Sequence, residues 1–138
     1  MDGNKIAELL KTNLQAALPD RVVTRNAVDP AARDAKDLCK GIYTIVVVAM
    51  DGLDAMRDYA DLTGTLRLLI AGDIKLDDNA NGEDVEQAEF ALFRDLFDFV
   101  KAPGAELCQL NIVRAQLSGQ TQAPYGWILA EVTHSELD

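Results

Sequence analysis

The chain has few basic residues, one histidine and two cysteines, and each of these shortages argues against particular classes of function. Only 13 lysines and arginines stand against 23 aspartates and glutamates among 138 residues, so the formal net charge is −10. Surfaces that hold a nucleic-acid backbone or an anionic membrane need clustered cations. No apolar run approaches the ~20 residues of a membrane-spanning helix. We therefore expect neither specific nucleic-acid binding nor membrane association.

The residues that usually carry catalysis are sparse. The single histidine, His134, precedes Ser135 and Glu136, and neighbours in an extended chain point in opposite directions, so these three cannot form a triad. We expect His134 on the surface at the end of a strand. Cys39 and Cys108 form no CxxC pair and are expected to be free, buried thiols. The glycines form neither a dinucleotide-binding motif nor a P-loop. We predict no enzyme, no catalytic residue and no cofactor.

A calcium-loop signal is present but incomplete. Residues Asp77–Gly82 match the first half of such a loop, D-x-N-x-N-G. The twelfth position, which needs a bidentate glutamate, is Ala88, and both Glu86 and Glu89 miss that register. We predict a polar turn that begins a helix, with no metal ion.

Hydrophobic periodicity predicts a single α+β domain over residues 1–138. The predicted elements are a helix at 4–18, a short strand at 21–25, a short helix at 31–39, strands at 42–50 and 65–74, a long helix at 83–101, and strands at 107–117 and 125–133. The sheet should be mainly antiparallel, with about 4–5 strands, and flanked by the N-terminal helix and the long helix. Residues 42–50 are apolar on both faces, which predicts a strand covered on both sides.

Four aspartates lie in the segment 51–62, which we expect to connect two strands. Asp51, Asp54, Asp58 and Asp61 are spaced by 3, 4 and 3 residues, which would place them on one face of a helix. Leu53 and Met56 would occupy a different face. The pattern predicts a solvated acidic face, and the alternatives are a site for a divalent ion or an acidic surface with a mechanical purpose.

The long helix carries more apolar surface than one sheet face requires. Phe90, Phe93 and Phe97 widen its apolar stripe to roughly 200°, against the ~100° typical of a surface helix. One explanation is a helix wedged deeply into its own core. The other is that these three phenylalanines bury a contact between subunits, where aromatic side chains are favoured.

The order of these elements resembles that of bacteriophage tail terminators, also called tail completion or head–tail joining proteins. The matching features are a first helix ending in Leu18-Pro19, a strand beginning Gly41-Ile42-Tyr43-Thr44-Ile45-Val46, a strand at Leu66 to Ile74 leading into a helix that begins Glu83-Asp84-Val85-Glu86-Gln87-Ala88-Glu89, and Pro124-Tyr125-Gly126-Trp127 entering the last strand. The resemblance covers almost the whole chain, but it rests on order and length, because this family has no invariant short motif.

Membership of that family would imply a structural role. Tail terminators assemble as hexameric rings on the end of the tail tube, stop its polymerisation and form the joint to the head connector protein. DNA passes through the ring without specific binding. The resemblance therefore implies a homo-oligomer, the tail tube protein and the head connector protein as partners, and a place at the head-proximal end of the virion tail after synthesis in the host cytoplasm. Either the run from Asp51 to Asp61 or the pair Asp77 and Asp78 could face the channel and repel DNA.

Two other binding functions fit the acidity of the chain. Small secretion chaperones are of similar length and acidity, act as dimers and bind unfolded effector segments, although they usually close with an amphipathic helix. An immunity or inhibitor protein would be acidic because its target is basic. Oligomeric state separates the first of these from a six-membered ring.

Overall fold

The computed structural model describes residues 2–55 and 62–135, without the side chains of residues 53–63. Within these residues the chain forms three α-helices, two short 3-10 helices and five strands. Their order is α1 (Gly3–Ala17), β1 (Val22–Thr24), η1 (Pro30–Ala32), α2 (Ala35–Lys40), β2 (Ile42–Ala55), β3 (Leu62–Lys75), α3 (Gly82–Lys101), η2 (Ala105–Leu107), β4 (Leu110–Leu117) and β5 (Tyr125–His134). None of the described helices is both long and apolar enough to cross a bilayer.

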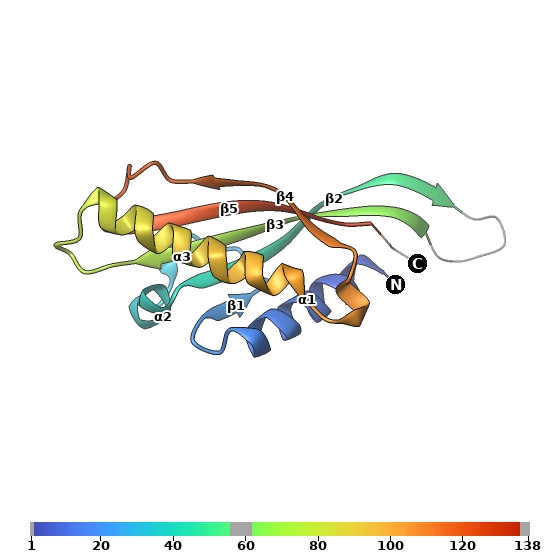
Figure 1. Ribbon diagram of the computed structural model, residues 1–138, viewed down its shortest axis with the longest axis horizontal. Helices are drawn as coiled ribbons and strands as arrows, with labels where there is room; N and C mark the ends of the chain where they lie inside the picture. Colours follow the sequence, from blue (N-terminus) through green and yellow to red (C-terminus); the bar gives the residue numbers. More distant parts are fainter. Residues whose placement is uncertain (1, 56–61, 136–138) are drawn as a thin grey trace.

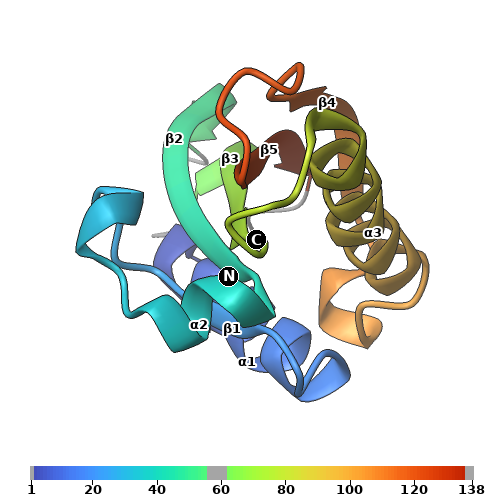
Figure 2. The same ribbon diagram turned by 90° about the vertical axis from the view of Figure 1, so that its left-hand side faces the viewer.

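The five strands form one mixed sheet in the order β1-β2-β3-β5-β4. β1 runs parallel to β2, and every other neighbouring pair is antiparallel. Both predicted flanking helices, α1 and α3, are present and lie across the same side of the sheet (Figures 1 and 2). The prediction of an α+β fold with a mainly antiparallel sheet is confirmed.

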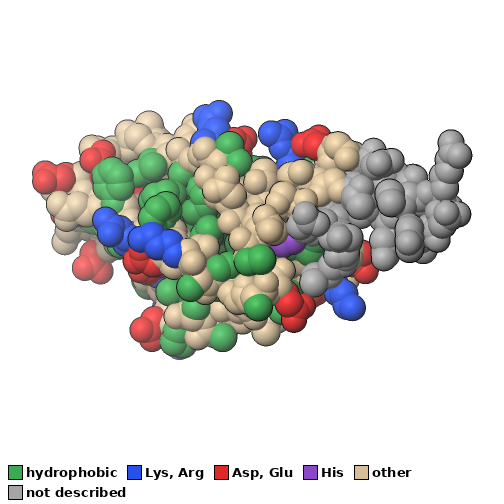
Figure 3. Space-filling view, turned by 45° about the vertical axis from the view of Figure 1, so that its right-hand side comes forward, with side chains coloured by type: hydrophobic (Ala, Val, Ile, Leu, Met, Phe, Trp, Pro, Cys, Tyr) green, Lys and Arg blue, Asp and Glu red, His purple; other side chains and the backbone are tan. Residues whose placement is uncertain are grey.

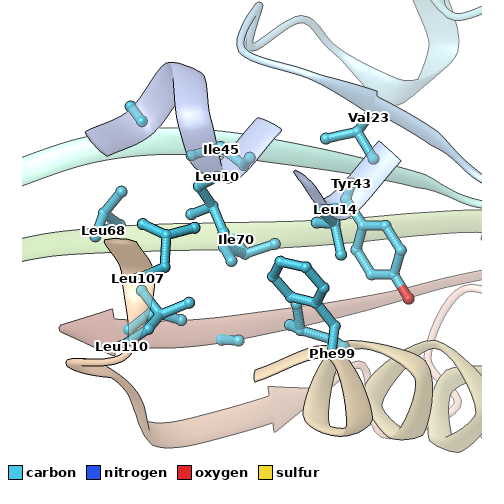
Figure 4. Packing of buried hydrophobic residues seen from close by; sticks show 14 of the residues in the cluster. Leu10, Leu14, Val23, Tyr43, Ile45, Leu68, Ile70, Phe99, Leu107 and Leu110 are labelled. Carbon is cyan, nitrogen blue, oxygen red and sulfur yellow. The ribbon is translucent and has the colours of Figure 1, made fainter. Parts of the chain in front are cut away.

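The core lies between these two helices and one face of the sheet (Figure 4). α1 contributes four residues at helical spacing, Ile6, Ala7, Leu10 and Leu14, all fully buried. The middle strand β3 contributes alternate residues, as its sequence predicted: Leu66, Leu68, Ile70 and Ile74. Burial of these side chains removes their apolar surface from water, which holds the helices against the sheet.

A smaller apolar contact lies on the opposite face of the sheet. Leu38 of α2 and Ile42 of β2 are 4% and 1% exposed, yet they lie outside the main cluster. Ile42 precedes Tyr43, which faces the core, so successive side chains in this strand point to opposite faces. The segment from η1 to α2 therefore covers only one end of the second face, where α2 contacts β3 (Figure 2).

Several predicted boundaries were wrong. The helix predicted at 31–39 is two short helices, because Asp34 adopts an extended backbone and caps α2 through the backbone N–H of Lys36. β4 begins three residues later than predicted, since Ala105–Leu107 form η2. Residues 51–55 and 62 of the predicted connector are strand, because β2 continues to Ala55 and β3 starts at Leu62, and the rest of the connector lies outside the described residues.

The two cysteines and the histidine were also placed wrongly. Cys39 and Cys108 are exposed free thiols, since short α2 buries only its Leu38 side and Cys108 follows the single turn of η2. His134 is 2% exposed rather than on the surface. It ends β5, which lies between β3 and β4, so Leu66 and Leu110 flank it on both sides.

Candidate interaction surfaces

The three phenylalanines predicted at a subunit contact divide into two environments. The buried stripe of α3 is Val85, Glu89, Leu92, Leu96 and Phe99. Phe93 borders this stripe and packs partly buried against the core. Phe90 and Phe97 lie farther around the helix and are 54% and 41% exposed. We call Phe90 and Phe97 the helix patch.

The helix patch is continuous with neighbouring side chains on α3. The ring centroids of Phe93 and Phe97 are 5.9 Å apart, and the Lys101 ammonium lies 4.8 Å from the centroid of Phe97. Hydrophobic side chains gather on the left half of Figure 3, over the region of α3. The structure thus supports both earlier explanations, one for each environment: Phe93 belongs with the core and the helix patch is available for contact.

A second apolar surface lies on β2, where the sequence predicted burial. Val47, Val48 and Met50 are 38%, 50% and 47% exposed. Val47 and Met50 lie opposite core-facing Leu68 and Leu66 in the ladder, so they share the core side of the sheet, and we call these two the β2 patch. Val48 is the extra residue at a bulge and instead lines a shallow hollow of about 70 Å³ together with Val113 of β4. β2 and β3 extend beyond the helices here (Figure 1), so only the first half of β2 is covered on both faces.

The number and length of the helices, compared with the length of β2, explain why the β2 patch is exposed. The predicted chain has two long amphipathic helices, and one sheet face accommodates both. A fourteen-residue strand spans about 46 Å at ~3.3 Å per residue, whereas a fifteen-residue helix spans about 22 Å. The helices therefore cannot cover the whole length of β2.

The predicted acidic face on one helix is not formed. Asp51 and Asp54 lie in β2, where their backbones pair with Thr65 and Thr63 of β3. The antiparallel partner supplies backbone hydrogen bonds to this segment, which favours strand over helix. The Asp51 carboxylate pairs with Arg67 at 3.1 Å.

The other predicted acidic residues lie elsewhere. Asp58 and Asp61 are outside the described residues. Asp77 and Asp78 follow the far end of β3, and Asp78 pairs with Lys75 at 3.3 Å. Ten residues of strand, about 34 Å, separate Thr65 from Lys75. The two acidic groups are therefore at opposite ends of the sheet and do not form one surface in a single chain.

The calcium-like turn serves the helix that follows it. The Asn81 side chain accepts the Asp84 backbone N–H at 2.9 Å, and the Asp84 carboxylate accepts the Asn81 backbone N–H at 3.2 Å. This reciprocal pair is a capping box at the start of α3. Across residues 2–55 and 62–135, no three histidine, cysteine or acidic side chains converge as a metal site would require.

A buried glutamate joins α3 to the β4–β5 loop, and the sequence did not mark it. Glu89 is fully buried within the apolar stripe of α3. Its Oε2 accepts hydrogen bonds from the Ser118 hydroxyl and, at 2.9 Å, from the Trp127 backbone N–H. A Cβ on Gly126 would lie 2.9 Å from Val85 Cγ1 and 3.0 Å from that same oxygen, so any larger residue would force these side chains to shift where β5 passes the carboxylate. These contacts position the start of β5.

The start of β5 borders a pocket of about 530 Å³, which no sequence motif indicated. Trp127 and Tyr125 line it from β5, Asp73 from β3, and Pro30 and Leu38 from the η1–α2 segment. The Asp73 side chain makes no hydrogen bond or ion pair with the described part of the chain. Burial raises the pKa of Asp73, and nearby Arg33 lowers it by a smaller amount.

The raised pKa of Asp73 gives a pH-dependent prediction. The folded chain binds the Asp73 proton more tightly than the unfolded chain does, so the stability that Asp73 contributes is lost as pH rises through its folded-state pKa. We expect Asp73→Asn to raise the melting temperature by a few degrees at pH 7, and to give no gain near pH 3, where the wild-type carboxyl is also neutral. Thermal melts of both proteins at the two pH values test this. An equal gain at both would show that the desolvated charge is not the cause.

No protein-family model matches the chain, and no curated protein matches it significantly.

Proposed function

We propose that this chain is a structural virion protein that caps the phage tail tube as a hexameric ring. In this role it ends tail polymerisation and forms the joint between the tail tube protein and the head connector protein. Its working location is the head-proximal end of the tail, and DNA passes through the ring without specific binding. The resemblance in element order and length first suggested this function.

The observation that carries the proposal is the presence of two different exposed apolar patches on one chain. The helix patch, Phe90 and Phe97, lies on α3, and the β2 patch, Val47 and Met50, lies on the projecting half of β2. When the helix patch of one copy packs on the β2 patch of the next, the contact is head-to-tail. Repeated contacts of that kind close into a ring when the rotation between copies fits. A two-fold dimer would instead bury the same patch on both copies.

The charge of the chain suits a channel for DNA. Each copy has a formal net charge of −10, so six copies produce a strongly negative assembly. A negative channel wall repels the phosphate backbone and lets DNA slide without binding. Acidic residues lie at both ends of the sheet, around Asp51 and around Asp77 and Asp78. Either end could line the channel.

Native mass spectrometry over a concentration series, with negative-stain imaging of the largest species, tests the proposal. We expect a six-chain species with a central hole, either alone or after addition of purified tail tubes. Dimers that never grow, even with tubes present, would contradict the ring and favour a secretion chaperone. Monomers that neither assemble nor bind to the tube ends would contradict both.

A further inference from the structure

The pocket beside Trp127 has the size and lining of a binding site and is separate from both apolar patches. Its volume of about 530 Å³ lies within the range of ~300–1,000 Å³ typical of ligand sites. The η1–α2 segment lines one side, and the start of β5 and residue Gln122 of the β4–β5 loop line the other. Figure 1 places α2 and the β4–β5 loop at the same end of the sheet. The hydrogen bonds that Glu89 accepts from the Ser118 hydroxyl and the Trp127 backbone N–H keep that loop and strand in position.

The charged residues that line the pocket are all acidic. Asp29 and Asp73 line it, and no lysine, arginine or histidine is among its lining residues in the described chain. The Asp29 side chain is partly engaged, since it accepts the Ala31 backbone N–H at 2.9 Å. The Asp73 carboxylate is half-buried without a hydrogen bond or ion pair from the described residues.

Arg33 is the described cation that lowers the pKa of Asp73, but the two side chains form no ion pair in the described part of the chain. The Arg33 Nη2 donates to the Asn26 carbonyl at 2.7 Å and to the Thr44 hydroxyl at 3.0 Å. Its influence on Asp73 lowers the pKa only in part, because burial is the larger effect. A desolvated carboxylate of this kind costs stability unless a cation compensates it.

The aromatic side chains of the pocket also favour a positively charged ligand. Trp127 and Tyr125 both line the pocket, and the faces of indole and phenol rings attract cations, indole most strongly. Because Lys75 of this chain already lies 5.7 Å from the Tyr125 ring centroid, Trp127 is the ring that we assign to a cation of the ligand. The volume exceeds that of one side chain, which leaves room for the backbone on either side of it.

We propose that this pocket binds a lysine or arginine side chain presented by an extended basic segment of a partner protein, with Asp73 accepting its hydrogen bonds and Trp127 packing on its cation. This goes beyond ring formation and does not rest on it, because the pocket is complete within one chain. The chain's net charge of −10 would also attract a basic segment from a distance.

Trp127 supplies a direct test, since it is the only tryptophan in the protein. The probe is an acetylated and amidated five-residue peptide with arginine between glycines, titrated into the full chain while tryptophan emission is recorded. The matched probe carries citrulline, which has almost the same shape as arginine and no charge. We expect a saturable change in emission with an arginine-peptide dissociation constant on the order of 1 mM, at least about tenfold tighter than that of the citrulline peptide.

Two variants test whether the arginine peptide binds at Asp73. Asp73→Asn should weaken arginine-peptide binding by at least about tenfold, and it is expected to fold because it removes a desolvated charge. Asp98→Asn removes the same charge from the exposed last turn of α3, away from the pocket lining, and should change binding less than about twofold.

Three results would overturn the proposal. The first is an absence of saturable change up to about 10 mM arginine peptide with the full chain. The second is equal binding of the citrulline peptide, which would show that charge is not recognised. The third is an equal loss in Asp98→Asn and Asp73→Asn, which would show attraction to the overall charge and not to this pocket. None of these readouts depends on whether the chain forms a ring.

Discussion

Replacement of the helix patch by the double substitution Phe90→Glu and Phe97→Glu should abolish ring assembly and leave each chain folded. Both side chains are more than two-fifths exposed, so the substitutions remove little from the monomer's core and should change its stability by no more than about 0.5 kcal/mol each. Aromatic side chains at the centre of an interface typically contribute at least ~2 kcal/mol each. At about 4 kcal/mol for the pair, the concentration needed for assembly should therefore rise by on the order of 1,000-fold.

Native mass and thermal melting, measured together, decide this prediction. A matched control is Thr12→Glu with Ala16→Glu, which adds two negative charges to exposed positions on a different helix, α1. Rings in the control and monomers in the Phe90 and Phe97 variant would support the helix patch as the contact. If both variants still form rings, the subunit contact lies elsewhere. Equal loss in both variants would indicate charge repulsion.

Phe93 should behave differently from its two neighbours. It packs against the core, so Phe93→Glu would bury a charge beside apolar side chains and destabilise the monomer itself. A folded monomer is therefore expected after substitution of Phe90 and Phe97, but not after Phe93→Glu. This contrast separates a core role from an interface role on the same helix.

The largest loss of folding stability is expected from Leu92→Ala, with a cost of about 3–5 kcal/mol. Leu92 is fully buried, and its methyl groups lie over two glycines. A Cβ on Gly41 would lie 2.9 Å from Leu92 Cδ2, and a Cβ on Gly72 would lie 3.5 Å from Leu92 Cδ1. Because backbone lines this contact, few side chains can move in to fill the cavity that alanine would leave.

The contact of Leu92 is also held in place by a buried hydrogen bond. The Tyr43 hydroxyl donates to the Leu92 carbonyl at 2.6 Å, and burial raises the pKa of the Tyr43 phenol, with a smaller lowering by Arg21. α3 is thereby anchored to β2 at the point where the cavity would form, which limits collapse of the helix onto the sheet.

Urea unfolding measures the effect of Leu92→Ala, with Leu9→Ala as the control because Leu9 is only partly buried against the same cluster. We expect the Leu9 variant to lose less than half as much free energy of unfolding. Comparable losses in the two variants would show that the glycine-lined contact has no special rigidity.

The local elements were determined by the sequence itself. The spacing of apolar residues in 4–18 and 83–101 predicted α1 and α3, because a helix brings residues three and four apart onto one face. The alternation in 65–74 predicted the buried face of β3 correctly. The acids and asparagines at 77–84 predicted a turn and a helix start, and the capping box of Asn81 and Asp84 is the local hydrogen bonding behind that pattern.

The surfaces and the pocket were decided only by the tertiary structure. Val47 and Met50 have a core-like pattern, yet they are exposed because β2 is longer than the helices that cover its core side. Glu89 is of a residue type usually found on the surface, yet it is buried. Ser118, just after β4, and Trp127 of β5 fold over it and donate hydrogen bonds to its carboxylate. Asp73 and Trp127 are 54 residues apart and meet because β3 pairs with β5 in that register. Periodicity reports which side of an element a residue lies on, but the neighbour that covers that side is set by long-range pairing.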